Sequence, residues 1–394
     1  MEAYALDWLN LLVRWVHLIT GIAWIGASFY FVWLDNSLQA PQVARDTEQG
    51  IGGELWAVHG GGFYHVQKYR VAPVELPSPL HWFKWEAYAT WLSGFALFVV
   101  MYYANARAYM IDPAVADLAP WQAVTSSLAL LGGGWVFYDQ LCKRLGLERD
   151  AVIAAAMVGF VTLVAWGLSH AFSGRAMFIQ VGAMLGTMMV GNVAHVIIPA
   201  QRELVRAKER NETPDPVHGR RGKQRSVHNN YFTLPVLFVM ISGHYPMTWG
   251  HSHAWLVLVA ILLVAAFVRH FFNLRHRGRT VWAIPVLGML ATVAIAIAIA
   301  PVRPAAGEVP SFARVQSIVA VRCASCHAER PSHAGFSVAP KGVMLDTPER
   351  IVAAAAKIGE QSVATKAMPI GNLSGMTDAE RMALGAWIAA GAPR

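Results

Sequence analysis

The chain has 394 residues, of which 55% are hydrophobic and only 14% are charged, and its formal net charge is +8. Its mean hydropathy of +0.39 and its 15 Trp residues are typical of a membrane protein with aromatic side chains at both interfaces, not of a soluble protein. The basic residues lie between apolar runs, which argues against nucleic acid as a partner. With three Cys residues the chain has no disulfide framework.

Eight apolar runs are each long enough to cross a bilayer as a helix, which needs about 20 residues. The chain begins with MEAYALDW, which has no positively charged segment, and the run after it is longer than that of a signal peptide. We therefore expect the first helix to be retained. The predicted spans are 8–34, 84–105, 121–141, 151–169, 176–199, 231–249, 253–272 and 280–301.

Lys and Arg are distributed unequally among the connections between these spans. Nineteen of them lie in or beside the odd-numbered connections, whereas the even-numbered ones hold only Arg107 and Arg175. Because positive residues favour the cytoplasmic side, the odd-numbered connections are predicted to be cytoplasmic. We expect a multi-pass protein of the bacterial inner membrane, with the lipid bilayer as a partner and both termini in the periplasm.

An ionisable residue, His17, lies inside the first predicted span, on one helical face with Arg14, Gly21 and Ser28. Such residues are expensive in lipid and are usually functional. Two interpretations stay open: a hydrogen bond to a neighbouring helix, or an iron ligand of a b-type haem. For the haem, His244 near the outer end of the sixth span is the expected second ligand.

The connection over 35–83 is too long for a simple connector, which usually indicates a function. It contains HGGGFYHVQKYRVAP, in which the Gly60–Gly62 run permits close backbone approach. In an extended segment, His65 shares one face with Gln67 and Tyr69, and Lys68 lies on the other. The sixth span begins with SVHNNYFTLP, which adds an imidazole and two amides at the same rim. Positive-inside charge explains the cations but not the histidines and glycines.

The segment RCASCHAER carries the C-x-x-C-H signature of covalent c-type haem attachment. It predicts thioether bonds to Cys323 and Cys326 and an iron bond to His327. Met368, which Pro369 follows, is the expected sixth ligand, and a thioether there raises the potential. Its rivals are Met344, Met376 and His333.

Around this motif, residues 312–394 predict a small helical domain. Thr347 with Pro348 at the first helical position, and Thr377 with Glu380 as a capping box, mark two helix starts. Phe312, Val315, Ile318 and Val319 predict one apolar face, and Leu384, Trp387 and Ile388 another.

Three helices around a haem resemble a small class I cytochrome c. The predicted fold is all-α, with an eight-helix membrane domain (1–302), a Pro-rich linker (303–311) and a cytochrome c domain (312–394). Haem c is attached on the outer face of the membrane, which agrees independently with the orientation given by the charges.

Four long motifs, WVHLITGIAWIGASFYFVWLDNSL, GGGFYHVQKYRVAP, LHWFKWEAYATWLSG and HNNYFTLPVLFVMISGHYP, closely resemble the bacterial membrane-bound urate hydroxylase (urate oxidase) family of purine catabolism. The resemblance implies oxidation of urate to 5-hydroxyisourate. It also implies that electrons pass to haem c, and on to a soluble cytochrome c or a terminal oxidase, without hydrogen peroxide being formed. The membrane is roughly 30 Å thick, which favours a further redox group near His17.

No established set of catalytic residues accompanies the resemblance, so the site is predicted from chemistry. Imidazoles move protons near neutral pH, and cations hold an anionic substrate. His195 is left out of the predicted site. The expected bases are His65 and His228, and the expected urate-binding residues are Lys68, Arg70, His81, Asn229 and Asn230.

Two other classes of function stay open. One is a respiratory electron-transfer subunit with a quinol donor, against which the long polar connection argues. The other is a transporter or sensor with a cytochrome tail. Discontinuous helices at mid-membrane favour a transporter, but Pro199, Pro235 and Pro285 lie near the ends of the predicted spans.

Overall fold

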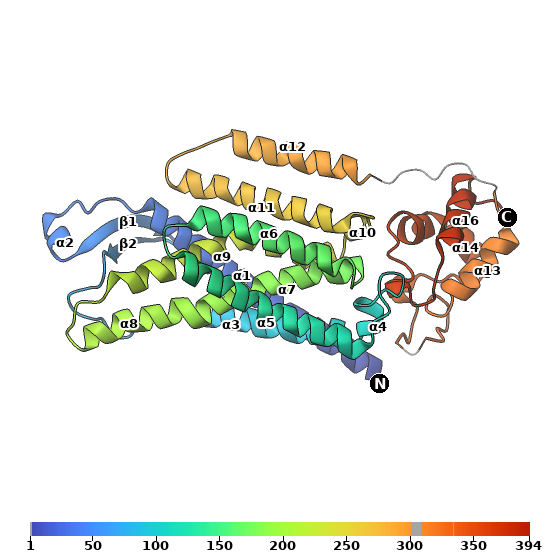
Figure 1. Ribbon diagram of the computed structural model, residues 1–394, viewed down its shortest axis with the longest axis horizontal. Coiled ribbons are helices and arrows are strands. Elements are labelled where there is room, and N and C mark those ends of the chain that lie inside the picture. Colours follow the sequence, from blue (N-terminus) through green and yellow to red (C-terminus); the bar gives the residue numbers. More distant parts are fainter. Residues whose placement is uncertain (1, 301–308, 334) are drawn as a thin grey trace.

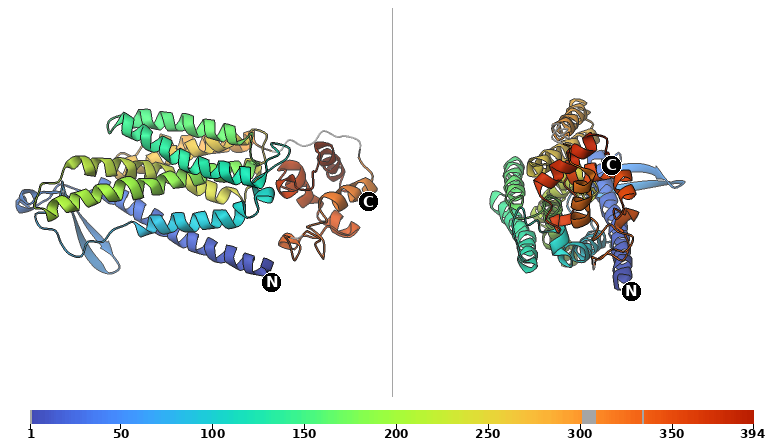
Figure 2. Two further views of the ribbon diagram at one scale, coloured as in Figure 1. Left: turned by 60° about the horizontal axis from the view of Figure 1, so that its bottom comes forward. Right: turned by 90° about the vertical axis from the view of Figure 1, so that its right-hand side faces the viewer.

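The computed structural model describes residues 2–300, 309–333 and 335–394. The protein is mostly helical, with one two-stranded sheet among these residues. The long helices of residues 2–300, here called the bundle, run side by side along one axis (Figure 1). Residues 309–394, here called the C-terminal unit, pack at one end of the bundle, where α1 also begins. The two strands lie at the opposite end (Figure 2, left).

Each of the eight predicted spans contains a helix. The long helices are α1 (Glu2–Ser37), α3 (Trp85–Phe98), α5 (Pro120–Leu145), α6 (Asp150–Leu168), α7 (Gly174–Asn192), α8 (Ile198–Glu209), α9 (Pro216–Ser242), α11 (Ala254–His276) and α12 (Ala283–Ala298). Short elements are α2 (Ala44–Glu48), α4 (Ala106–Tyr109), α10 (Pro246–Trp249) and two π-helical turns, η1 (Val99–Tyr103) and η2 (Val193–Ile197).

By length and composition, four helical segments of the described residues could cross a membrane. They are Trp8–Ser37, Asp150–Leu168, Gly174–Glu209 and Ala254–His276, and α12 is apolar but shorter. Large hydrophobic side chains are exposed along α1 and α12, for example Trp15, Ile22 and Ile297. A lipid environment would remove these side chains from water.

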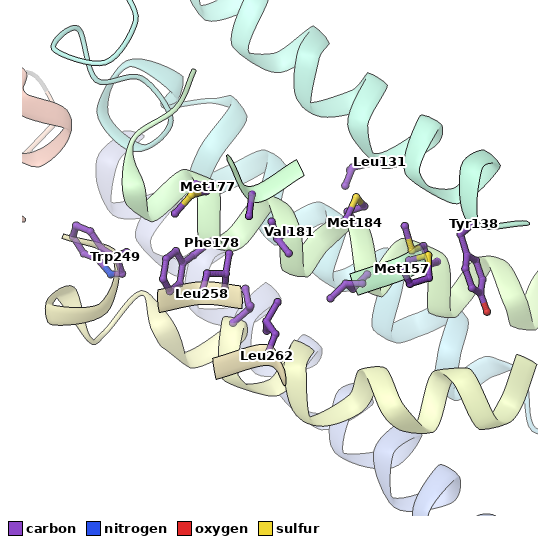
Figure 3. Packing of buried hydrophobic residues seen from close by; sticks show 14 of the residues in the cluster. Leu131, Tyr138, Met157, Met177, Phe178, Val181, Met184, Trp249, Leu258 and Leu262 are labelled. Carbon is purple, nitrogen blue, oxygen red and sulfur yellow. The ribbon is translucent and has the colours of Figure 1, made fainter. Parts of the chain in front are cut away.

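The core of the bundle surrounds α7, which packs against α3, α5, α6, α9 and α11. Met177, Phe178, Val181 and Met184 of α7 are fully buried in one apolar cluster. Figure 3 shows this cluster, with Trp249 toward one end and Tyr138 toward the other. The side chain of Ser173 caps α7 by accepting a hydrogen bond from the Ala176 amide.

The predicted connection between the fifth and sixth spans is largely helical, which corrects its expected bounds. The fifth span continues without a break through η2 into α8, and α9 begins at Pro216, well before residue 231. The side chain of Asp215 caps α9, and Pro216 occupies its first position. Hydropathy alone misses these extensions because their residues are polar.

The all-α expectation is wrong at one place, where β1 (Ile51–His59) pairs with β2 (Gly62–Tyr69) in an antiparallel hairpin. Gly60 and Gly61 form the two-residue turn with φ values of +56° and +83°. Two successive positive φ values match the turn type that best fits the twist of paired strands. The glycine run therefore serves the turn, and His65 lies opposite Trp56 in the pair.

The C-terminal unit has an apolar cluster of its own. Its predicted starts are confirmed: Thr347 caps α14 and Pro348 follows it, and Thr377 and Glu380 form a capping box on α16. The predicted faces are confirmed by the burial of Val315, Ile318, Val319, Leu384 and Trp387. Residues 303–308 of the predicted linker lie outside the described residues. The elements are α13 (Phe312–Arg322), η3 (Pro340–Gly342), α14 (Pro348–Ala353), α15 (Ala355–Ile358), η4 (Gly359–Ala364), η5 (Ile370–Asn372) and α16 (Asp378–Ala389).

Candidate functional site

A cavity of about 770 Å³ in the C-terminal unit is lined by Cys323, Cys326, His327 and Met368. The sequence predicts these four residues as the haem c site. The Nδ1 atom of His327 lies 2.9 Å from the Val343 carbonyl oxygen, which fixes the ring and leaves Nε2 available. Burial raises the pKa of the Cys323 thiol to about 11. The residue types, and their position around one cavity, therefore match the requirements of a covalently attached haem.

The loop that carries Met368 is held by Arg381, a residue that the sequence reasoning missed. Arg381 lies buried in α16, and its Nη1 donates 2.8 Å to the Met368 carbonyl oxygen and also to that of Ser362. Of the three rival ligands only His333 also lines the cavity, and Met376 is instead buried in the apolar cluster. In the sequence, only its position on the apolar face of α16, beside Leu384, could have indicated a role for Arg381.

The bundle contributes to the wall of the same cavity. Tyr109, Arg175, Gly243, His244 and Pro246 line it from the side of α4, α7 and the turn before α10. His244, the expected partner of His17, is thus placed beside the residues predicted to bind haem c.

His17 lies half-buried against α3. Its Nδ1 is 3.0 Å from the Thr90 carbonyl oxygen and 3.3 Å from the Ser93 hydroxyl, so the first of its two interpretations describes the contacts present. Gly94 makes room for the ring, since a Cβ atom there would lie 2.7 Å from His17 Cε1. Within the described residues no hydrogen bond or ring contact joins His17 to His244.

At the opposite end of the bundle, α5, α7 and α9 share a buried polar network. Arg225 donates 2.9 Å to Asp139 and 3.3 Å to Asn192, and its guanidinium lies 4.9 Å from the centre of the Tyr138 ring. Asn192 donates 3.0 Å to the hydroxyl of Tyr138, which lies 2.8 Å from His228 Nδ1. Four side chains of three helices thereby fix the position of the predicted base.

His228 also faces Asp150 at the start of α6, with 3.5 Å between Nε2 and Oδ1. Burial is the main cause that lowers the pKa of His228 from its ordinary value, and Arg225 adds to it, while Asp150 acts in the opposite direction. The lowered pKa favours the neutral imidazole, which is the form that can accept a proton.

A cavity of about 1240 Å³ borders this network, between the α5–α6 turn, η2, α8 and the start of α9. Cys142 and Asp150, which contact His228, line it. His195, which sequence reasoning left out of the site, lines it too, with its ring 5.8 Å from that of Trp135. The cations that line it are Lys143, Arg149, Arg220, Arg221, Lys223 and Arg225.

Three of these cations are free for a ligand. Arg225 and Lys143 pair with Asp139, and Lys223 pairs with Asp35. Among the described residues, no ion pair involves Arg149, Arg220 or Arg221. The wall also carries the carboxylates of Glu148, Asp150 and Glu203, so six cations face three carboxylates and the wall as a whole favours anions.

The predicted residues of the hairpin lie outside this cavity. His65 pairs with Glu54 at 2.9 Å, and its ring stacks on Trp56 at 4.2 Å. The hydrogen bonds from the Gln42 amide and from His65 lower the pKa of Glu54. Arg70 is exposed, and His81 packs its ring edge to face with Phe83 at 4.6 Å. Lys68 pairs with Asp35, which also holds Lys223, so one carboxylate connects the hairpin to the cavity wall.

The two predicted amides lie on different faces of α9 and are both buried. Asn229 accepts a hydrogen bond from Asn192 at 2.8 Å and donates one to the Met189 carbonyl oxygen. Asn230 instead donates to Asn273 and accepts from Arg269 at 2.6 Å. Adjacent residues point about 100° apart on a helix, which separates the pair.

Comparison with protein families gives a match over residues 3–300 to the family described as urate oxidase N-terminal. Searches of curated proteins and of solved structures gave no significant match. The matched residues include the hairpin, the buried network and the basic cavity, and they indicate an oxidoreductase that acts on urate. Because the match covers most of the chain, this protein belongs to the urate oxidase N-terminal family.

Proposed function

We propose that this protein oxidises urate to 5-hydroxyisourate at the bacterial inner membrane and delivers the electrons to its own haem c. The family match over residues 3–300 carries this proposal. Urate and one water give 5-hydroxyisourate, two protons and two electrons, with the new oxygen taken from water. Dioxygen is not consumed, so no hydrogen peroxide is formed.

Urate is a planar anion, and the cavity beside His228 has the charge to hold it. Arg149, Arg220 and Arg221 lack an ion-pair partner in the described part of the chain, and charge-assisted hydrogen bonds are the strong ones. His228 accepts a proton from urate or from the attacking water, and Asp150 stabilises the charged imidazolium. Tyr138 orients the ring through its hydroxyl.

The hairpin residues and the amides keep a supporting place in the proposal. Lys68 and Arg70 add positive charge at the same end, and Lys68 reaches Asp35 at the edge of the cavity. His65 is the alternative base, and His81, which packs on Phe83, stays a proposed urate-binding residue. Asn229 and Asn230 position the helices, because their hydrogen-bonding groups contact protein partners.

The residues of the C-terminal cavity fit haem c. The thiols of Cys323 and Cys326 supply the thioether bonds, His327 offers Nε2, and Met368 offers its sulfur. When bound, the haem accepts one electron at a time and passes it to a soluble cytochrome c or a terminal oxidase. Arg381 holds the Met368 loop in place through two carbonyl oxygens.

We further propose a b-type haem that binds within the bundle through His17. The hydrogen bond from Nδ1 to Thr90 leaves Nε2 available, the arrangement usual for iron-ligating histidines. His244 stays the proposed partner, although it lines the other cavity. A pyridine haemochrome spectrum should show b-type haem besides c-type haem, and a spectrum with c-type haem alone would end this part of the proposal.

Eight membrane-spanning helices with both termini in the periplasm complete the proposal. The start of α1 and the C-terminal unit lie at one end of the bundle, and the hairpin and the α8–α9 connection lie at the other (Figure 1). This arrangement supports urate entry from the cytoplasm and electron exit on the outer face. A reporter that is active only in the cytoplasm should be silent when fused after Arg394, and strong activity there would contradict the topology.

The decisive experiment adds urate to isolated membranes without oxygen and follows urate absorbance and haem c reduction together. We expect one urate lost for every two electrons that reach haem, and no peroxide when oxygen is readmitted. A variant with Cys323→Ala and Cys326→Ala is the control and should reduce no haem c. Urate consumption that requires oxygen and produces peroxide would refute the proposal.

A further inference from the structure

The cavity that holds the predicted haem ligands is shared between two parts of the chain. Its wall combines His327 and Met368 of the C-terminal unit with Tyr109, Arg175 and His244 of the bundle. The role of the bundle at this cavity depends on the haem c of the proposed function.

Two glycines show that the parts fit together closely. Gly371 of the C-terminal unit has φ +55°, and a Cβ atom there would lie 2.7 Å from the Ala108 carbonyl oxygen and 2.9 Å from that of Arg107. From the other side, a Cβ atom on Gly250 would collide with the Thr365 carbonyl oxygen. Backbone meets backbone at both points, so even a methyl group would separate the surfaces.

Arg175 is the cation that the bundle places in this wall. Its guanidinium lies over the Trp249 ring at 4.8 Å and near the Tyr109 ring at 5.9 Å. Its Nε is buried without a hydrogen-bond partner in the described residues, among which Arg175 also forms no ion pair. Arg322, by contrast, lines the cavity already paired with Glu380 at 3.1 Å. A half-buried cation without a carboxylate partner is costly unless a ligand supplies one.

We propose that Arg175 binds a propionate of the haem that the C-terminal unit carries, so that the bundle completes the haem site. A propionate is a carboxylate, and a guanidinium pairs with it through two parallel hydrogen bonds. The Trp249 and Tyr109 rings lie beside the guanidinium and limit its movement. This contact would keep the C-terminal unit docked on the bundle beside α4, α7 and His244.

Reduction removes one positive charge from the iron, so a nearby cation favours the reduced haem and raises its midpoint potential. Arg175→Gln removes the cation and should lower the potential of haem c in the purified full-length protein. Arg175→Lys keeps the charge and should restore most of the difference. A potential equal to that of the unaltered protein in Arg175→Gln would overturn the proposal, because a purely structural role does not require a charge.

Docking is tested by a pair of glycine variants. Gly371→Ala should separate the surfaces, whereas Gly375→Ala is the matched control, since Gly375 has φ +65° and only Arg322 Nη1 at 3.7 Å near its Cβ position. In the Gly371→Ala background, Arg175→Gln should cause no further fall in potential. An equal fall in both backgrounds would overturn the docked arrangement, and Gly250→Ala gives a second route if Gly371→Ala fails to fold.

The failure of this inference differs from the failure of the proposed function. If the unaltered protein carries covalent haem but Arg175→Gln does not change its potential, only the role of Arg175 is overturned. Absence of covalent haem in the unaltered protein overturns both. The haem stain is therefore measured first in every variant.

Discussion

The hairpin and the buried network lie at the same end of the bundle, but they hold their polar groups differently. In the hairpin, His65 and Lys68 each have one carboxylate partner, and both side chains are partly exposed, although Glu54 is buried. In the network, Arg225, Asn192 and Tyr138 share partners, and the predicted base His228 ends the chain of contacts.

This difference indicates which group can do chemistry. Exposed ion pairs contribute about 0–1 kcal/mol and leave their members free to move. Buried networks polarise their members and keep them in one geometry, which a positioned base requires. We therefore expect the hairpin to influence access to the site and the network to hold the reacting groups.

The largest effect should come from the base. His228→Ala should lower the rate of urate-dependent haem c reduction by about 10²–10⁴-fold, the usual loss when a positioned base is removed. His65→Ala should lower it less, and the opposite order would place the base in the hairpin. His270→Ala is the matched control, because His270 makes a similar 2.7 Å contact with the Tyr231 hydroxyl, whereas His228 contacts Cys142 and Asp150 of the cavity wall.

The second effect concerns the stability of the network. Arg225→Met leaves Asp139 without its buried partner, and breaking such a pair costs about 3–5 kcal/mol. Lys143 still contacts Asp139 at 2.6 Å, which places the expected loss near the lower end. Thermal unfolding in detergent measures it. Arg206→Met, which breaks the exposed pair with Glu203, should leave the midpoint unchanged, and equal shifts in both variants would contradict the distinction.

The third effect is on the pH dependence of the rate. Burial holds the pKa of His228 below its ordinary value, so the neutral base should persist to a lower pH than in a free imidazole. Asp150 raises that pKa, and Asp150→Asn should therefore move the acidic limb of the pH–rate profile further down. A shift toward higher pH, or none, would show that a group other than His228 controls the limb.

The smallest effect is expected in the hairpin. Glu54→Gln removes the carboxylate that pairs with His65, while the stacking on Trp56 remains. Glu54 is buried, but His65 is partly exposed and the pair lies outside the basic cavity, so we expect less than about a twofold change in the urate rate. A loss as large as that of His228→Ala would show that the hairpin, and not the network, holds the reacting groups.

Local patterns in the sequence were sufficient for the helices and for several of their ends. Each predicted apolar run contains a helix, but the polar α8 and the first half of α9 carry no such signal. The caps at Thr347 and Thr377 depend on residues only a few positions apart, and the structure confirms them. The C-x-x-C-H spacing likewise brings Cys323, Cys326 and His327 to one cavity within a single turn of chain.

The composition of the sites depended on contacts between distant segments. Asp139 and Arg225 are 86 positions apart, and no pattern in either helix identifies the other as its partner. The sequence places Asn229 beside Asn230, but packing turns one toward α7 and the other toward α11. His195 lines the basic cavity and Arg175 lines the C-terminal cavity only because segments far apart in the chain pack together there. Sequence spacing therefore determined what forms within one helix or turn, and tertiary packing decided which side chains share a cavity.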